Sequence, residues 1–159
     1  MTIRVNPRGT RGGRVPTPLV RLIGKWQMRT YRRSGEQRVR ESAGFPVVLV
    51  TTRGAKTGKE RTAPLGGFAE GDDAWLVVAS LGGAARHPSW FLNMAKHPDD
   101  IWLEVGGERF QVRGESLEGQ ERAQALARIA KIAPRYGRYQ EKTDREIPVV
   151  RLTRAAPLA

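Results

Sequence analysis

One stretch of the sequence decides the fold, Val48-Leu49-Val50-Thr51-Thr52-Arg53-Gly54-Ala55-Lys56-Thr57-Gly58-Lys59-Glu60-Arg61-Thr62-Ala63-Pro64-Leu65. A β-branched apolar run enters a short turn rich in lysine and arginine, and a second apolar segment leaves it. Two such runs around a short turn predict a β-hairpin. The turn directs basic side chains and backbone N–H groups to one point, which suits an anionic ligand.

Two familiar phosphate motifs do not fit this turn. A nucleotide P-loop needs Gly, four residues, then Gly-Lys-Ser/Thr, but Gly54 is one residue too close to Gly58 and Glu60 occupies the place of the hydroxyl. Lys56-Thr57-Gly58 matches one element of the β-lactamases, which also need a Ser-x-x-Lys nucleophile. No serine in the chain has a lysine three residues later.

Composition limits the class of protein. A chain of 159 residues with an ordinary apolar fraction is expected to fold as one domain with a single core. It has no cysteine and two isolated histidines, so we expect neither disulfides nor a metal site. No stretch suits a membrane span or a secretory signal, and a cytoplasmic location is expected.

The net charge of +12 favours anionic partners such as nucleic acid, anionic lipid or a ligand with several carboxylates and phosphates. Many solvated arginines need no ligand at all. The strongest concentration outside the hairpin lies in residues 1–16, where Arg4, Arg8, Arg11 and Arg14 stand among glycines and prolines. So few apolar side chains predict a disordered basic arm.

Residues 17–44 are predicted to form an N-terminal amphipathic helix region. Thr17-Pro18 is typical of a helix start. An apolar stripe then recurs at helical spacing, formed by Leu19, Leu22, Ile23 and Trp26, with basic residues on another face. We expect this helix to pack on its own domain with a solvated outer face. The alternative is peripheral contact with an anionic membrane through residues 17–33.

Residues 45–155 are predicted to form the main domain. The expected strands are 46–52, 61–68, 74–80, 101–105, 109–115 and 147–152, and the expected helices are 88–96, 120–133 and 136–143. In the second of these helices Leu126, Ile129 and Ile132/Ala133 are expected to face the core. Antiparallel strands with helices at their edges predict an α+β fold, a small β-barrel with peripheral helices.

Four blocks of sequence resemble one known family in the correct order. They are Thr51-Thr52-Arg53-Gly54-x-Lys56-Thr57-Gly58-x-x-Arg61-x-x-Pro64-Leu65, Ala79-Ser80-x-Gly82-Gly83-Ala84, Pro88-x-Trp90-x-x-Asn93, and Tyr136-x-x-Tyr139-Gln140-x-x-Thr143-x-Arg145-x-Ile147-Pro148-Val149-Val150. Together they resemble the deazaflavin-dependent nitroreductase and quinone reductase family. Its members are oxidoreductases with a split β-barrel, of the FMN-binding split-barrel type, that use the deazaflavin coenzyme F420.

The resemblance implies a set of cofactor-binding residues, namely Lys56, Thr57, Gly58, Arg61, Pro64, Leu65, Val78, Ala79, Ser80, Trp90 and Asn93. The coenzyme carries a tricyclic ring, a phosphate and an oligoglutamate tail. The cationic turn suits the phosphate, and Arg53 and Lys59 are candidates for the tail. The ring is expected along the Ala79–Gly82 edge, where small residues allow a close approach of the backbone.

The resemblance also implies the reaction, a hydride transfer from the reduced deazaflavin to a quinone, an activated alkene or a nitro-aromatic acceptor. The cofactor carries this chemistry and the protein orients it. Tyr136, Tyr139 and Ser80 are the expected catalytic residues, because a hydroxyl group near the acceptor oxygen can donate a hydrogen bond. Two departures from relatives, Ala133 and Leu81, fall near the acceptor side and leave substrate scope open.

Two other functions compete with this hypothesis. An FMN-dependent split-barrel reductase would need the same phosphate site, but FMN has no glutamate tail and leaves the surplus cations unexplained. A non-enzymatic basic barrel that binds nucleic acid would explain the charge. It lacks aromatic residues interleaved with the basic ones for base stacking, so no nucleic acid is expected as a partner.

Overall fold

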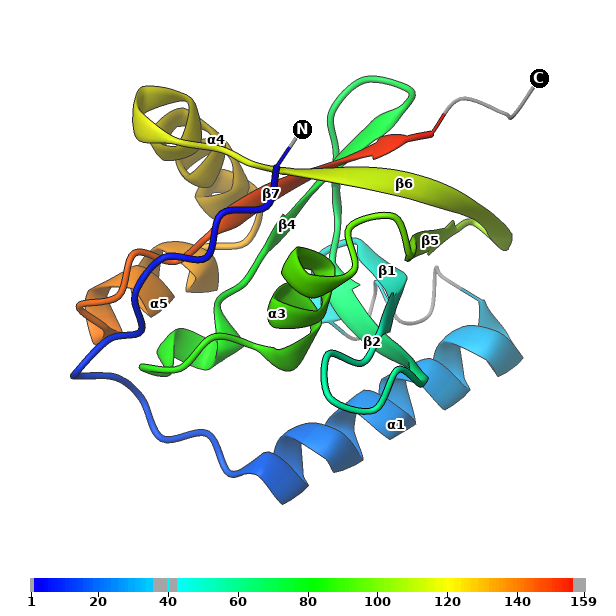
Figure 1. Ribbon diagram of the computed structural model, residues 1–159, viewed down its shortest axis with the longest axis horizontal. Helices are drawn as coiled ribbons and strands as arrows, with labels where there is room; N and C mark the ends of the chain where they lie inside the picture. Colours follow the sequence, from blue (N-terminus) through cyan, green and yellow to red (C-terminus); the bar gives the residue numbers. More distant parts are fainter. Residues whose placement is uncertain (1, 36–39, 41–42, 156–159) are drawn as a thin grey trace.

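The computed structural model describes residues 2–35, 40 and 43–155, and the rest of the predicted 17–44 region lies outside the described residues. Its strands form one antiparallel sheet that curls into a half-barrel (Figure 1). The strands are β1 Val47–Arg53, β2 Glu60–Gly66, β3 Phe68–Ala69, β4 Ala74–Val78, β5 Ile101–Val105, β6 Glu108–Ser116 and β7 Val149–Arg154. Their order in the sheet is β2-β1-β5-β6-β7-β4-β3.

Helices stand at the edges of the sheet, as the sequence predicts. Those that the structure describes in full are α1 Thr17–Ser34, α3 Ser89–Lys96, α4 Gly119–Ile132 and α5 Arg135–Lys142, and a 3-10 turn η1 lies at Leu81–Gly83. The α+β split-barrel class with peripheral helices is therefore confirmed. The strand expected at 61–68 is divided at Gly67, whose N–H donates to the carbonyl of Pro46 instead of continuing the ladder.

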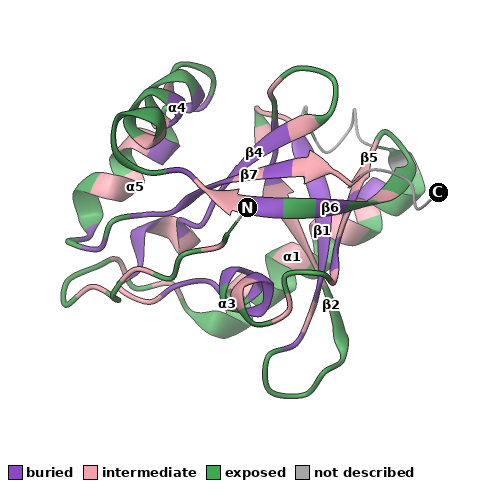
Figure 2. Ribbon diagram, turned by 45° about the horizontal axis from the view of Figure 1, so that its top comes forward, coloured by how far each residue is buried: buried purple, intermediate pink, exposed green. Residues whose placement is uncertain are grey.

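Strand β6 joins the two halves of the sheet. Its first residues pair with β5 about the Gly106-Gly107 turn, as predicted, and Val112 to Ser116 pair with β7. The interior between the halves is filled by apolar side chains that are shielded from solvent, among them Val50, Leu103 and Leu152 (Figure 2). Phe91 and Met94 of α3 close this core from one end.

The orientation of two helices differs from the sequence prediction. The apolar stripe of α1 faces outward, and Leu19, Leu22, Ile23 and Trp26 are 48–66% exposed. The helix does contact β2, but through other residues: a Cβ on Gly24 would lie 3.9 Å from Pro64. In α4, Ile129 is buried and Leu126 packs against the core as predicted. Ala133, just past the end of the helix, is buried, whereas its neighbour Ile132 is 56% exposed.

The N-terminal segment contains no helix or strand from residue 2 to residue 16, yet it lies against the body of the molecule (Figure 1). Backbone N–H groups of Gly9 and Gly13 donate to the carbonyls of Ala85 and Gly83. The carboxylate of Asp144 accepts hydrogen bonds from the N–H groups of Thr10 and Arg11, each 2.9 Å long. Composition predicts a disordered arm because it counts apolar side chains and cannot register such backbone contacts.

Candidate active site

A single groove of about 1240 Å³ brings together almost all of the residues predicted for the site. Its walls come from α1, the turn between β1 and β2, strand β2, η1, α3 and α5. The predicted residues that line it are Lys56, Thr57, Arg61, Pro64, Leu65, Val78, Ser80, Trp90, Asn93, Tyr136 and Tyr139. Gly58 lies in the same turn but does not line the groove, and Ala79 is fully buried behind the wall.

The turn between β1 and β2 is tied by its own backbone. The N–H of Gly54 donates to the carbonyl of Lys59, and the N–H of Gly58 donates to the carbonyl of Gly54. Both hydrogen bonds are 2.8 Å long. Gly58 has φ +70°, a conformation that favours glycine. This closure leaves the side chains of Lys56 and Thr57 exposed at the tip.

Arg53 is used within the protein. Its Nε donates to the carboxylate of Asp100 and its Nη1 donates to the carbonyl of Gly58, each at a distance of 3.0 Å. The guanidinium therefore holds the turn against the loop after α3. Lys59 does not line the groove. The structure therefore gives no support for Arg53 or Lys59 as tail-binding residues.

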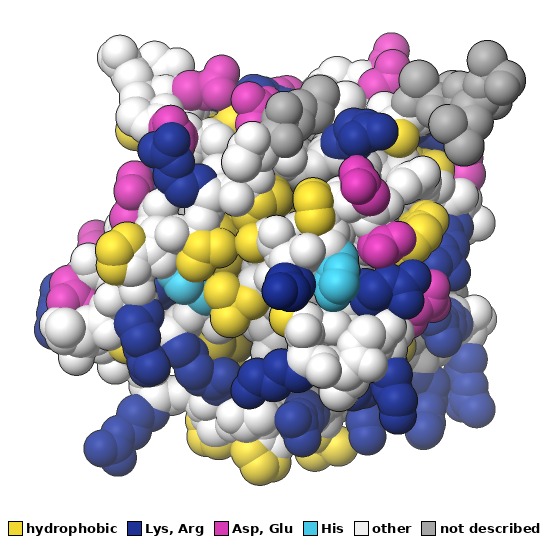
Figure 3. Space-filling model, viewed as in Figure 1, with side chains coloured by type: hydrophobic (Ala, Val, Ile, Leu, Met, Phe, Trp, Pro, Cys, Tyr) yellow, Lys and Arg dark blue, Asp and Glu magenta, His cyan; other side chains and the backbone are white. Residues whose placement is uncertain are grey.

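Other cations line the groove instead. They are Arg21 and Lys25 from α1, Lys56 and Arg61 from the hairpin, Arg86 from the loop after η1, and Arg135 from α5, against the single carboxylate of Glu60. Within the described residues, neither Lys56 nor Arg61 has a side-chain hydrogen bond or ion pair. Figure 3 shows lysine and arginine side chains gathered over the lower part of the molecule, where Figure 1 places α1. The part of the groove beside the hairpin and α1 suits a ligand with several negative charges, whereas Arg135 lies at the other end, with its guanidinium 4.8 Å from the centroid of the Phe45 ring.

Asn93 connects α3 to the cationic turn. Its Oδ1 accepts a hydrogen bond of 2.9 Å from the N–H of Ala55, and its Nδ2 donates one of 3.1 Å to the hydroxyl of Thr52. Asn93 is only 7% exposed, so both ends of the buried amide are satisfied inside the protein. Its position indicates that it holds the turn in place beside the groove.

The loop after β4 forms the opposite wall. Val78 and Ser80 are buried at its start, and Trp90 of α3 packs edge-on against Phe91 beside it. Leu81, Gly82 and Gly83 have φ values of 43°, 62° and 82°. Three successive positive values fold the chain sharply, and Leu81 is the only residue other than glycine with positive φ in the described part of the chain.

The other end of the groove is aromatic. Tyr136 packs edge-on against Phe45, Phe68 and Tyr139, each with ring centroids 5.7 Å apart. Burial raises the pKa of Tyr136 to about 12, with the neighbouring Tyr139 adding to the shift, while Arg135 and the backbone of Gly66 oppose it. Tyr136 is therefore a hydrogen-bond donor at neutral pH and a weak acid. The half-buried Tyr139 lies one helical turn further along α5.

Arg145 is the residue that the sequence analysis quoted without giving it a role. Its side chain is 1% exposed and its guanidinium donates to the carbonyls of Ala79, Ser80 and Ala84, behind the wall of the groove. A signal was available in the sequence, since this arginine stands two residues before the apolar run Ile147 to Val150, which is buried and leads into β7. Charge alone assigns an arginine to the surface, which is why it was missed.

An antiparallel half-barrel with this groove defines a split-barrel reductase. The chain belongs to the F420H(2)-dependent quinone reductase family, whose model matches residues 23–154. It is 41% identical over 114 residues to the F420H(2)-dependent quinone reductase Rv1261c of Mycobacterium tuberculosis, covering 69% of this chain and 74% of that protein. It also matches the solved structure of an F420-H2 dependent reductase, FDR-A, at 39% identity and a TM-score of 0.61, covering 67% of this chain and 93% of that one.

The protein is therefore an oxidoreductase whose cofactor is coenzyme F420, and the groove fits that group chemically. Unpaired cations at one end suit its phosphate and carboxylates. The tightly folded backbone of the Leu81–Gly83 wall leaves space for a flat ring, and the tyrosines at the far end offer hydroxyl groups.

Proposed function

We propose that the groove binds coenzyme F420 with its phosphate at the cationic turn and its ring along the Ala79–Gly82 wall, where it reduces a quinone held at the aromatic end. The observation that carries this proposal is the division of one continuous groove into a cationic part and an aromatic part. The predicted binding residues are distributed accordingly. Lys56, Thr57 and Arg61 stand at the first part, and Tyr136 and Tyr139 at the second.

At the cationic end, Lys56 and Arg61 donate charge-assisted hydrogen bonds to phosphate oxygens, and Thr57 adds a hydroxyl group. The glutamate tail extends toward Arg21 and Lys25, since these side chains line the same groove and lie one helical turn apart on α1. Asn93 contributes by fixing the turn, because both ends of its amide are already bonded within the protein.

At the ring, the reduced coenzyme supplies the hydride. Val78 and Ser80 line the wall along which the ring would lie, with Ala79 buried behind it, and the apolar surfaces of Trp90, Pro64 and Leu65 line the groove and would exclude water. Ser80 and Tyr139 present hydroxyl groups to the acceptor oxygen, where a donated hydrogen bond stabilises the negative charge that develops on reduction. Tyr136 supports Tyr139 by packing edge-on against it.

The acceptor is proposed to be a quinone, with activated alkenes and nitro-aromatic compounds as further substrates. Apolar and aromatic side chains line the groove, among them Met28, Phe45 and Leu65, and Phe45 packs against Tyr136. Such walls stack on planar electrophiles without selecting one strictly.

A fluorescence titration tests the proposal. Purified protein is titrated with oxidised coenzyme F420 and, in parallel, with FMN and with a DNA duplex. We expect micromolar or tighter binding of the deazaflavin and much weaker binding of FMN, followed by quinone-dependent oxidation of the reduced coenzyme. Tighter binding of FMN than of coenzyme F420 would contradict the proposed cofactor of this groove. Binding of the DNA duplex without affinity for either cofactor would contradict the whole proposal.

We also propose that α1 docks the enzyme peripherally on the inner, anionic face of the cytoplasmic membrane. Leu19, Leu22 and Trp26 are at least half exposed, and Arg21, Lys25, Arg29, Arg32 and Arg33 are exposed around them. Within the described residues no helix is long and apolar enough to cross a bilayer. An exposed apolar stripe bordered by cations is the pattern of a helix that lies in the membrane interface, where lipid-soluble quinones are available.

Vesicle sedimentation tests this docking. The protein should sediment with vesicles that contain anionic phospholipid and stay in solution with neutral vesicles. The variant Leu22→Gln with Trp26→Gln should lose sedimentation at unchanged net charge. Equal sedimentation of the variant and the unchanged protein would show that charge alone attracts the protein, and would overturn docking through the apolar stripe of α1.

A further inference from the structure

Arg145 lies behind the groove in a setting that an arginine rarely occupies. Its side chain is 1% exposed, and no carboxylate forms an ion pair with it among the described residues. Its partners are neutral backbone carbonyls. Nε donates to that of Ala84, Nη1 to that of Ala79 and Nη2 to that of Ser80, at distances of 2.9–3.0 Å. Burying an unpaired charge is costly, so the protein maintains this arrangement against a substantial desolvation cost.

A fourth contact places the guanidinium precisely. Nη1 also lies 3.1 Å from Nδ1 of His87. Because arginine only donates, Nδ1 must accept, and the imidazole proton is on Nε2, which lies 2.6 Å from the carbonyl of Asn6 in the N-terminal segment. The guanidinium is therefore held by the loop on one side and by the N-terminal segment, through His87, on the other.

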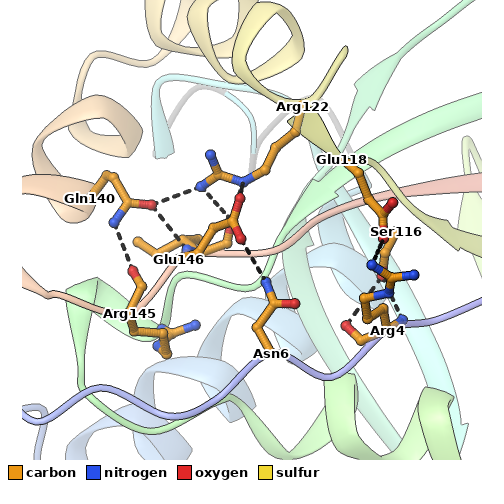
Figure 4. A network of polar contacts seen from close by, with 9 residues as sticks. Arg4, Asn6, Ser116, Glu118, Arg122, Gln140, Arg145 and Glu146 are labelled. Atoms are coloured by element: carbon orange, nitrogen blue, oxygen red, sulfur yellow. Dashed lines mark hydrogen bonds and ion pairs between the residues drawn. The ribbon is translucent and has the colours of Figure 1, made fainter. Parts of the chain in front are cut away.

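The backbone of Arg145 is fixed as firmly as its side chain (Figure 4). The Nε2 of Gln140, on α5, donates a hydrogen bond of 2.7 Å to the carbonyl of Arg145. The Oε1 of the same Gln140 amide accepts two hydrogen bonds, one of 2.8 Å from Arg122 of α4 and one of 2.9 Å from the N–H of Ile147. The position of the guanidinium is thus set by two helices and by the segment that leads into β7.

The loop that Arg145 holds is the least relaxed backbone around the groove. Its three acceptor carbonyls flank the positive φ values of Leu81, Gly82 and Gly83. A left-handed leucine is retained only when the surrounding structure determines it. The rigid, planar fork of arginine contacts three carbonyls at once, which the single ammonium of lysine does not reproduce.

We propose that Arg145 is the positioning residue of the coenzyme site: its buried guanidinium fixes the Ala79–Ala84 loop in the shape that receives the deazaflavin ring. This inference rests on the proposed binding mode. Arg145 acts on the ring end of the groove only, because its contacts are with the loop and none is with the cationic turn.

The test separates the ring end from the phosphate end with two ligands, complete coenzyme F420 and a fragment that keeps the deazaflavin ring but lacks the phosphate and the tail. Both are titrated by fluorescence into the unchanged protein and into Arg145→Lys, Lys56→Ala and Arg151→Lys. The last variant is a matched control, because Arg151 is a partly buried arginine that pairs with Glu70 and does not line the groove.

We expect Arg145→Lys to weaken both ligands by the same factor, about tenfold, the scale of one charge-assisted hydrogen bond. Lys56→Ala should weaken only the complete coenzyme, and Arg151→Lys neither. The absorption spectrum of the bound ring should also change in Arg145→Lys and not in Lys56→Ala. A folded Arg145→Lys that binds both ligands like the unchanged protein would overturn the inference.

A milder variant keeps the test decisive if Arg145→Lys does not fold. His87→Leu removes one contact of the guanidinium and leaves Arg145 in place. It should weaken both ligands equally by a few fold, and unchanged affinities would overturn the inference. Failure of the unchanged protein to bind either ligand would overturn the proposed binding mode itself, which is a different result from loss in the Arg145 variants alone.

Discussion

Neighbouring side chains in the cationic turn have different roles, and the structure separates them. Lys56 lines the groove without a partner among the described residues, whereas Lys59, three residues later, does not line it. The sequence alone could not distinguish the two, because both are lysines in one turn. Their difference follows from the hydrogen bonds that close the turn at Gly54 and Gly58.

Replacing Lys56 with alanine should weaken binding of coenzyme F420 by about 1.5–3 kcal/mol, the scale of a hydrogen bond to a charged group. Lys59→Ala removes the same charge from the same turn and should leave the affinity nearly unchanged. Fluorescence titration of both variants measures the difference. Equal losses would mean that net charge, and not contact with the phosphate, attracts the coenzyme.

Tyr136 should ionise at a higher pH than an ordinary tyrosine. Its pKa is raised to about 12 from the ordinary value of 10.0 because burial disfavours the phenolate. The folded state therefore keeps a proton that the unfolded state loses, and the free energy of unfolding should fall as the pH rises above 10 toward 12. Ultraviolet titration of phenolate should show an ionisation near pH 12, and Tyr136→Phe should remove that step.

At the scale of elements, hydrophobic pattern predicts existence and boundaries better than orientation. The strands, the Gly106-Gly107 turn and the helices all appear close to their expected positions, because alternation and spacing are local properties. The outward stripe of α1 was not predictable in the same way. A helix that lines a groove on one side and meets solvent on another does not have to turn its most apolar face inward.

Asn93→Ala should loosen the cationic turn from α3. It leaves the N–H of Ala55 and the hydroxyl of Thr52 without their partner, at a cost of about 1–3 kcal/mol in the free energy of unfolding. Urea denaturation measures this loss, and the affinity for the complete coenzyme should fall with it. Asn93→Asp is the informative comparison, because it keeps the acceptor for Ala55. An affinity unaffected by both changes would separate the turn from the binding site.

At the scale of the whole molecule, the parts that the sequence could not place are those held by contacts between distant segments. His87 joins three of them, since it lies between Asn6 and Arg145 and packs on Phe91 of α3. The pairing of a neutral histidine with a buried arginine is invisible in the sequence. It also explains how a segment with little apolar content stays against the body of the protein.

This junction should make the stability depend on pH. Burial lowers the pKa of His87 from its ordinary value of 6.5, and the charge of Arg145 lowers it further, against the hydrogen bond to Asn6. The unfolded chain then binds a proton that the folded chain refuses, so the free energy of unfolding should fall as the pH falls below 6.5 and level off below the folded pKa. Of the charged groups nearby, Arg145 faces the ring and Glu146 contacts Asn6.

Urea denaturation between pH 7.5 and pH 5 checks this dependence, with a limiting slope of about 1.4 kcal/mol per pH unit for one proton. His87→Asn retains an acceptor for Arg145 and cannot titrate in this range. Its free energy of unfolding should vary less over the same interval. A variant as sensitive to pH as the unchanged protein would assign the effect to another group.

The place of β7 in the sheet governs how the chain can fold as it is synthesised. In sequence β7 comes after all the other strands, but in the sheet it lies between β6 and β4. Strands β1, β2, β5 and β6 can pair among themselves before β7 is made, whereas the free edge of the β3–β4 hairpin waits for β7 to leave the ribosome. Until then that edge is an open template for other chains. Chaperone binding and the speed of this final step should therefore limit the yield of native enzyme.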